Sequence, residues 1–235
     1  MLREIVDKLD SFEKKIKHTF GNKSLLVQAF THRSYLNEHK EFLLEHNERL
    51  EFLGDAVLEL VVTEYLYVIY EKKTEGELTS IRAALVNTTS LSKSASEIGL
   101  DSYLLLSRGE AKDKGRARGV IWANAFEALV GALYLDGGYK VAKKFLDSHL
   151  LNKTETIVAG SLWQDPKSVL QEKSQEIEGV TPMYKTIKEV GPDHAKTFTV
   201  GVYFAGKLAG RGTGASKQEA ETAAARAALT ARKWN

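Results

Sequence analysis

The segment that most constrains this chain is HNERLEFLGDAVLEL, residues 46–60, where three carboxylates stand in a strongly apolar stretch. Glu48, Glu51 and Asp55 follow the spacing i, i+3 and i+7, which places them on one stripe of a helix. Apolar side chains cover most other directions and predict a helix buried nearly all round: Leu50, Phe52, Leu53, Val57, Leu58, Leu60, Val61 and Val62. Buried ionised carboxylates are unfavourable unless they are paired or bind a metal. A solvated acidic face is the usual alternative, but the apolar surroundings favour a convergent acidic site.

A second apolar segment, residues 120–136, carries matching groups, because Asn124 and Glu127 lie one turn apart and share a helix face. Gly54 interrupts the first helix at a cost of about 1 kcal/mol relative to alanine, which suggests close approach of another element to its backbone. Oxygen ligands without His or Cys favour a hard cation, Mg²⁺ first and Mn²⁺ second. Such an ion activates water beside a phosphodiester, so the pattern predicts metal-dependent phosphodiester hydrolysis.

The hydrophobic period changes along the chain and predicts two domains. Residues 1–158 show helical patterning without strand alternation and predict an all-α domain. Residues 159–235 contain the end of a linker, placed at about 152–166, and then a small α+β domain of order α-β-β-β-α. Its expected elements are a helix at 166–179, strands at 183–190, 196–206 and 207–212, and a helix at 216–232.

Composition excludes several classes of protein. The chain has no cysteine, so disulfides, thiolate catalysis and cysteine-based zinc sites are excluded. No apolar run approaches the roughly 18 residues of a membrane span, and the N-terminal segment is unlike a signal peptide, so we expect no membrane association and a cytoplasmic location. The net charge of +2 is too small to identify a partner.

The segment at residues 46–60 closely resembles the most recognisable motif of the ribonuclease III family. Further segments fit the family pattern in the same order, namely AFTHRSY at 29–35, EGELTSIRAALV at 75–86 and ANAFEALVGALYLD at 123–136. The C-terminal α-β-β-β-α region is similar to double-stranded RNA-binding domains, so the resemblance covers nearly the whole chain. It implies an Mg²⁺-dependent endonuclease that homodimerises, cuts both strands of an RNA duplex and leaves short 3′ overhangs. RNA processing, including that of ribosomal RNA, is the implied role, while ribosomal precursor, messenger and viral duplexes all remain open as natural substrates.

The resemblance also assigns roles within the acidic segments. Glu51, Asp55 and Glu127 correspond to catalytic metal ligands, whereas Glu48 and Glu75 correspond to accessory acidic positions nearer the RNA. The fourth ligand position, usually Asp in the family, is Asn124 here. An amide oxygen binds Mg²⁺ but supplies no negative charge.

Three functions therefore remain open. The first is a nuclease that retains activity, and the second is a catalytically impaired regulator that binds duplex RNA without cutting it. The third is a phosphohydrolase of small nucleotides, which the C-terminal domain and the missing His-Asp metal pair both disfavour.

The RNA-binding resemblance implies three contact regions. Polar side chains on its first helix suit the 2′-hydroxyls of a minor groove, with a solvated face as the alternative: Ser168, Gln171, Glu172 and Gln175. His194 lies in a loop expected to enter a second minor groove. Lys217, with free backbone N–H groups after a glycine-rich turn, predicts a phosphate site at a helix N-terminus. Gln218 stands where relatives often carry a second basic residue, so we expect weaker phosphate binding.

The remaining segments carry weaker signals. Residues 108–118 place five cations and two glycines before the second acidic helix, which predicts a flexible phosphate-holding loop or an ordinary solvated one. Thr31, His32 and Arg33 are expected to be polar partners inside the helical core. Phe52 is expected in the core first and in a dimer interface second.

Overall fold

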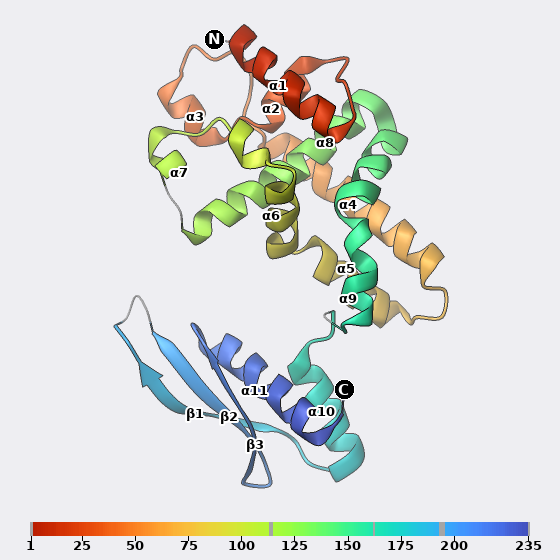
Figure 1. Ribbon diagram of the computed structural model, residues 1–235, viewed down its shortest axis with the longest axis vertical. Coiled ribbons are helices and arrows are strands. Elements are labelled where there is room, and N and C mark those ends of the chain that lie inside the picture. Colours follow the sequence, from red (N-terminus) through yellow and green to blue (C-terminus); the bar gives the residue numbers. More distant parts are fainter. Residues whose placement is uncertain (1, 113–114, 162, 193–195, 235) are drawn as a thin grey trace. The chain divides into compact units, whose positions relative to one another are not determined.

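The protein is described by a computed structural model that covers residues 2–112, 115–161, 163–192 and 196–234. The chain divides into two compact units, a helical unit at Met1–Trp163 and a C-terminal unit at Gln164–Asn235 (Figure 1). The predicted order, an all-α region followed by α-β-β-β-α, is confirmed. Within the described ranges, no helix has both the length and the apolar character needed to span a membrane.

The helical unit contains these elements: α1 (Leu2–Ile16), α2 (Lys23–Ala29), α3 (Arg33–Glu38), α4 (Glu48–Ile69), α5 (Glu75–Val86), α6 (Thr88–Glu97), η1 (Leu100–Tyr103), α7 (Arg108–Lys112), α8 (Arg116–His149), η2 (Leu151–Lys153) and α9 (Thr154–Ala159). The α8 helix is kinked at Gly138, where φ is 75°. The segment suggested as a linker begins inside this unit, because residues 154–159 are helical and Thr154 is fully buried.

Helices α4 and α8 form the centre of the helical unit, and their backbones nearly touch. A Cβ atom on Gly54 would lie 1.8 Å from the carbonyl oxygen of Glu127, and one on Gly131 would lie 2.3 Å from that of Leu50. Only glycine leaves room for such an approach, so the prediction that something closely approaches Gly54 is confirmed. The two acidic helices therefore cross at a fixed point.

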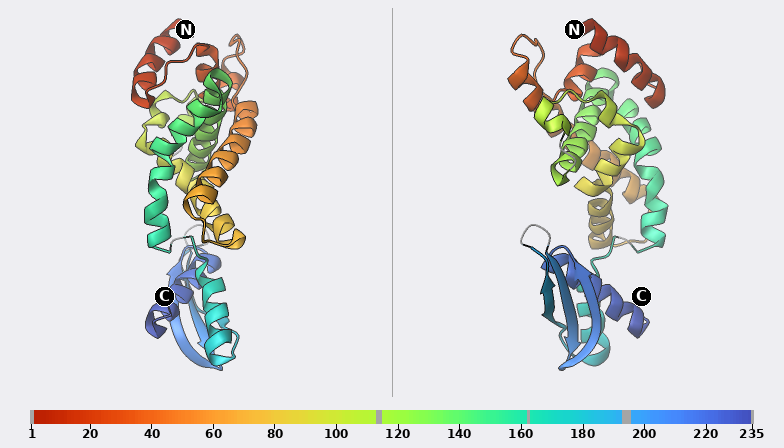
Figure 2. Two further views of the ribbon diagram at one scale, coloured as in Figure 1. Left: turned by 90° about the vertical axis from the view of Figure 1, so that its right-hand side faces the viewer. Right: turned by 60° about the vertical axis from the view of Figure 1, so that its left-hand side comes forward.

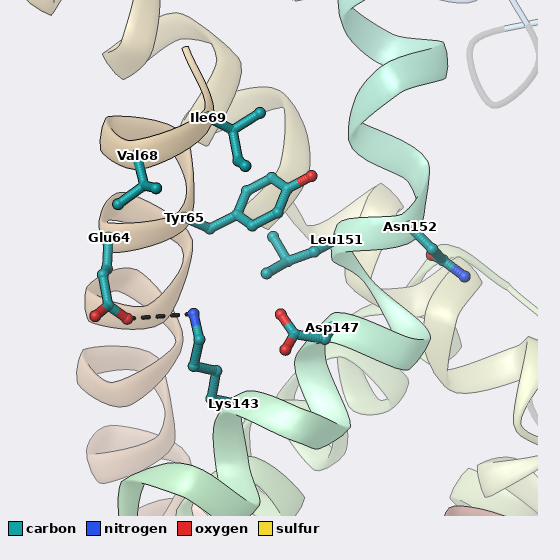
Figure 3. A pocket seen from close by; sticks show the side chains of 8 residues that line it. All are labelled: Glu64, Tyr65, Val68, Ile69, Lys143, Asp147, Leu151 and Asn152. Carbon is teal, nitrogen blue, oxygen red and sulfur yellow. Dashed lines mark hydrogen bonds and ion pairs between the residues drawn. The ribbon is translucent and has the colours of Figure 1, made fainter. Parts of the chain in front are cut away.

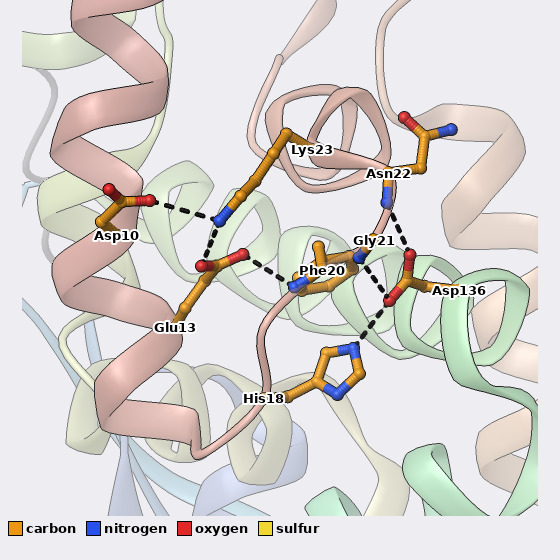
Figure 4. A network of polar contacts seen from close by, with 8 residues as sticks. All are labelled: Asp10, Glu13, His18, Phe20, Gly21, Asn22, Lys23 and Asp136. Atoms are coloured by element: carbon orange, nitrogen blue, oxygen red, sulfur yellow. Dashed lines mark hydrogen bonds and ion pairs between the residues drawn. The ribbon is translucent and has the colours of Figure 1, made fainter.

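A polar network fastens the middle of α8 to the segment before α2 (Figure 4). The Asp136 carboxylate accepts hydrogen bonds from His18 Nε2 at 2.8 Å and from the backbone N–H groups of Gly21 and Asn22 at 3.2 and 2.9 Å. Glu13 on α1, only 5% exposed, binds the same segment through the Phe20 backbone N–H. These contacts hold α8 in register beside the N-terminal helices.

The expectation that α4 is buried nearly all round is wrong. One side of α4 packs in the core through Leu50, Val57 and Val62, but Phe52 is 82% exposed and Leu60 also lies largely in solvent. Phe52 is therefore not a core residue of this chain. The apolar pattern of α4 serves two surfaces, one facing the core and one facing outward.

The C-terminal unit comprises α10 (Pro166–Glu178), β1 (Met183–Val190), β2 (Thr197–Phe204), β3 (Lys207–Gly214) and α11 (Lys217–Arg232). The strands form an antiparallel sheet of order β1-β2-β3, and both helices lie on one face of it (Figure 2). Alternate glycines on β3, namely Gly210, Gly212 and Gly214, leave room for the α11 backbone, which a Cβ on Gly212 would meet at 2.2 Å. Alanines on α11 complete this close contact: Ala220, Ala224 and Ala228.

Candidate functional site

The α4–α8 crossing gathers the four predicted metal-site residues. Glu51 and Asp55 come from α4, on either side of the close contact at Gly54, and Asn124 and Glu127 come from the facing turns of α8. The Asn124 amide makes a side-chain hydrogen bond to Glu51, and Glu127 is electrostatically coupled to Asp55 and Glu51. Residues more than 65 positions apart in the sequence thus form one acidic cluster.

Burial and mutual repulsion raise the proton affinity of this cluster. Burial, followed by repulsion from Asp55 and Glu51, raises the pKa of Glu127 to about 7. The pKa of Glu51 is also raised, mainly by burial and by the neighbouring Glu48, although the hydrogen bond from Asn124 opposes this shift. The cluster therefore holds like charges that a nearby cation would stabilise.

The donor chemistry fits a hard divalent cation. Three carboxylates and one amide oxygen match the all-oxygen sets that Mg²⁺ binds. Among the residues that the structure describes, no three His, Asp or Glu side chains are grouped closely enough to ligate one ion. Binding would thus require the side chains to turn toward the ion, a movement that the exposed position of Asp55 permits.

Glu48 lies beside the cluster at the start of α4 and is close to Arg33 and His46. Arg33 Nη1 lies 3.5 Å from its carboxylate, and His46 Nδ1 lies 3.8 Å away. Because the Arg33 side chain is 70% exposed, the expectation that it lies inside the core is wrong. Thr31 is buried and donates to the Val27 carbonyl, as expected of a polar partner in the core.

His32 is the N-cap residue of α3. Its Nδ1 accepts a hydrogen bond from the Ser34 backbone N–H, and burial lowers its pKa. The residue therefore has a structural role at a helix N-terminus.

Glu75 is not brought to this cluster. It begins α5, beyond the opposite end of the 22-residue α4, which is about 33 Å long at the usual helical rise. There it accepts a hydrogen bond from Thr79 and lines a hollow with Arg82. Within one chain, Glu48 and Glu75 therefore stand at opposite ends of α4.

The basic segment at 108–118 is not simply a loop, because residues 108–112 form α7 and residue 116 begins α8. Arg118 packs over the Trp122 ring at 5.5 Å and donates to the Ala111 carbonyl. Lys114 lies outside the described residues. Among the described cations of this segment, Arg108 and Lys112 lie in α7, just before the helix that carries Asn124 and Glu127, and Arg118 lies in the first turn of that helix.

Two hollows contain none of the four predicted metal-site residues, and the sequence did not predict them. One, of about 570 Å³, is lined by α4, α8 and η2, with Glu64 and Lys143 paired at its rim (Figure 3). It contains none of the predicted site residues. The other, of about 680 Å³, lies beside Phe52 and is lined by the predicted site residue Glu48 and by Leu25, Leu53 and Leu135 among others.

The predicted contact residues of the C-terminal unit lie on its surface. The polar side chains of α10 line one side of the helix and are at least partly open to solvent: Ser168, Gln171, Glu172 and Gln175. The Ser168 hydroxyl also binds Asp165, which caps α10. His194 lies outside the described residues.

The start of α11 differs in part from the prediction. Ser216 caps the helix by accepting from the Glu219 backbone N–H, and the Glu219 carboxylate accepts from Ala215 N–H. Two N–H groups of this turn are therefore engaged and not free. Lys217 and Gln218 are both exposed, and Lys217 pairs with Glu189.

Comparisons with known proteins match both units. Residues 22–154 match a family described as ribonuclease-III-like, and residues 166–231 match the double-stranded RNA binding motif. Ribonuclease 3 of Protochlamydia amoebophila is 42% identical over 229 residues, which cover 97% of this chain and 94% of that protein. Ribonuclease 3 of Enterococcus faecalis is 48% identical over 210 residues, which cover 89% and 91%.

A solved structure is similar to the helical unit. The nuclease domain of ribonuclease III from Campylobacter jejuni, described as structurally flexible in a region involved in dimer formation, is 38% identical to this chain. It matches with a TM-score of 0.56, over 61% of this chain and 96% of that one.

Proposed function

This chain belongs to the ribonuclease III family and is an endoribonuclease of double-stranded RNA, and we propose that the cluster at the α4–α8 crossing is its Mg²⁺ site. The proposed ligands are Glu51, Asp55, Asn124 and Glu127. The observation that carries this proposal is the close contact at Gly54, which holds carboxylates from two helices together despite their repulsion.

Each side chain has a distinct part in the proposed mechanism. When bound, Mg²⁺ supplies an activated water and stabilises charge on the phosphodiester, and Mn²⁺ is the expected substitute. Glu127, Glu51 and Asp55 supply the negative charge that holds the ion, and Asn124 adds a neutral oxygen while it orients Glu51 by a hydrogen bond. Hydrolysis of both strands would leave short 3′ overhangs.

Cleavage of a long perfect duplex in Mg²⁺ tests this function. We expect the unmodified chain to cut the duplex, and Asp55→Ala and Glu127→Ala to leave it intact while still binding it. Binding should persist because the RNA-binding motif matches a separate unit. An intact duplex after incubation with the unmodified chain would exclude the activity.

A second function is supported by one residue, Asn124. A neutral amide at a position where the family usually has Asp leaves the site with three carboxylates, so the chain would bind duplex RNA with impaired cleavage. The Asn124→Asp variant separates the two functions. If it cuts orders of magnitude faster at unchanged RNA affinity, the impaired regulator is the better description; similar rates support the active nuclease.

We further propose that the helical unit forms a homodimer through the outer face of α4. Phe52 projects from this face at 82% exposure, beside a hollow whose wall includes Leu135, itself 54% exposed. An isologous pair would let each Phe52 enter the hollow of the other copy, since one patch then meets itself. The flexible dimer-forming region of the Campylobacter jejuni nuclease domain supports the proposal.

Sedimentation at micromolar concentration tests the dimer. The unmodified chain should sediment as a dimer and Phe52→Asp as a monomer, with Val190→Asp on the C-terminal unit as a control exposed apolar residue. A monomeric unmodified chain would overturn the proposal. The cytoplasmic location stays a prediction.

A further inference from the structure

We propose that Glu189 sets the strength and salt dependence of duplex-RNA binding by competing with an RNA phosphate for the ammonium group of Lys217. The inference rests on the phosphate-binding role that the sequence predicts for Lys217. It adds a residue that neither the sequence pattern nor the family resemblance singled out.

The two side chains form an accessible ion pair. Lys217 Nζ lies 3.3 Å from Glu189 Oε1, and the side chains are 60% and 40% exposed. Glu189 stands near the end of β1, directly opposite Phe198 of β2 in the antiparallel register. The Lys217 ammonium also lies 5.8 Å from the Phe198 ring centroid, so it is held between a carboxylate and an aromatic face. A phosphate arriving from solvent can reach this pair.

The charges at the start of α11 make the Lys217–Glu189 pair important for phosphate binding. Lys217 is the one cation in the first turn, because Gln218 is neutral and the next residue is Glu219. The Glu219 carboxylate already binds the Ala215 N–H, so a second negative charge stands at this helix end. With Glu189 beside the ammonium, the side chains of this turn present no net positive charge to a phosphate.

Glu189 should act mainly as a competitor of the phosphate for Lys217, and not as a residue that positions the ammonium for the phosphate. An ammonium has three donors, so Glu189 could in principle hold Lys217 in place while a phosphate binds a second donor. A largely exposed lysine gains little from one such contact, however, because an exposed ion pair corresponds to only about a two- to fivefold change in an equilibrium constant. The carboxylate meanwhile occupies the ammonium and cancels its field, so removal of the carboxylate should tighten binding.

Binding of the full chain to a duplex of about 20 base pairs tests the proposal, with divalent cations omitted to prevent cleavage. Glu189→Gln should tighten binding about threefold at low salt. The slope of log K against log salt should steepen by roughly one phosphate contact, and the gain should shrink at high salt. Glu189→Ala provides a second neutral variant, and thermal unfolding of each confirms that it is folded.

A double-mutant cycle separates this inference from the proposed role of Lys217. Lys217→Ala alone should weaken binding, and adding Glu189→Gln to it should bring no gain. If Lys217→Ala weakens binding but Glu189→Gln does not tighten it, Glu189 is not a competitor, although the role of Lys217 stands. If Lys217→Ala changes nothing, both claims fail.

A matched control tests for a general charge effect. Glu178→Gln removes the same charge from a pair with Arg232, at the far ends of α10 and α11. It should leave the affinity unchanged. Equal tightening by Glu178→Gln, or by Glu189→Gln in the Lys217→Ala background, would show non-specific attraction and overturn the proposal.

Discussion

Both units rely on glycine to bring two elements into near backbone contact, but they use that contact differently. At Gly54 and Gly131 the contact joins α4 to α8 and holds three carboxylates near one another, with the pKa of Glu127 raised to about 7. At Gly210 and Gly212 it joins β3 to α11, and the atoms nearest to these glycines belong to alanines of that helix. The candidate active site therefore holds like charges together in the fold, whereas the side chains predicted to bind RNA lie on the surface and destabilise the fold little.

The largest expected effect comes from filling the first contact. Gly54→Ala places a methyl group where the Glu127 backbone stands, so α4 and α8 must separate. We expect a loss of about 3 kcal/mol or more of unfolding free energy, together with loss of cleavage. Chemical denaturation measures the first and a duplex-cutting assay the second.

A glycine far from the crossing supplies the control for that change. A methyl group on Gly76 in α5 would meet no atom within 4 Å, so Gly76→Ala should be neutral or stabilising by about 0.5–1 kcal/mol. Equal losses for both variants would mean that the crossing is not the constraint inferred here.

Because like charges repel at the crossing, Glu127→Gln should increase the stability of the folded protein in a pH-dependent way. The pKa of Glu127 is about 7 in the folded protein, against an ordinary value of 4.5. The stability that the protonated side chain contributes is therefore fully present below pH 4.5 and is lost as the pH rises through 7. Glutamine stays neutral, so in EDTA the variant should be more stable above pH 7 by roughly 1–2 kcal/mol after discounting for solvent screening. Thermal unfolding at pH 4.5 and pH 8 measures this, and a gain equal at both pH values would contradict it.

Asn124→Asp should increase the repulsion at the crossing and destabilise the metal-free protein, by a smaller amount than Glu127→Gln stabilises it. It removes the amide donor to Glu51 and adds a fourth carboxylate, so the metal-free protein should lose about 1 kcal/mol. Added Mg²⁺ should reverse that loss and raise the melting temperature of the variant more than that of the unmodified chain. Asn124→Ala, which removes the hydrogen bond and one oxygen ligand without adding charge, should lose stability and gain less from Mg²⁺ than the unmodified chain. If Mg²⁺ raises the melting temperature of Asn124→Asp only as much as that of the unmodified chain, position 124 does not hold a metal ligand.

The features that lie within one helix could be predicted from the sequence, and the contacts between distant segments could not. The spacing of Glu51 and Asp55 and the cost of Gly54 are properties of a single helix, and they pointed to the crossing. An apolar pattern does not distinguish a core from an outward interface, which is why Phe52 was misplaced. The pairing of Lys217 with Glu189 joins a strand end to a helix start, and the position of Glu75 depends on the full length of α4. Both need the fold.

The smallest expected effect lies on the surface of α10 that is predicted to bind RNA. Gln171 is exposed, so Gln171→Ala should change the unfolding free energy by less than about 0.5 kcal/mol. If its amide binds a 2′-hydroxyl, duplex affinity should fall about two- to tenfold, the range of one hydrogen bond. Lys173→Ala is a neighbouring control, since that side chain pairs with Glu176 and is outside the predicted stripe. Gln171→Ala should therefore bind duplex RNA more weakly and keep its stability, whereas Gly54→Ala should lose both stability and cleavage. Binding assays and chemical denaturation of each variant measure this contrast. A loss of stability in Gln171→Ala would mean that this surface, like the crossing, is coupled to the fold.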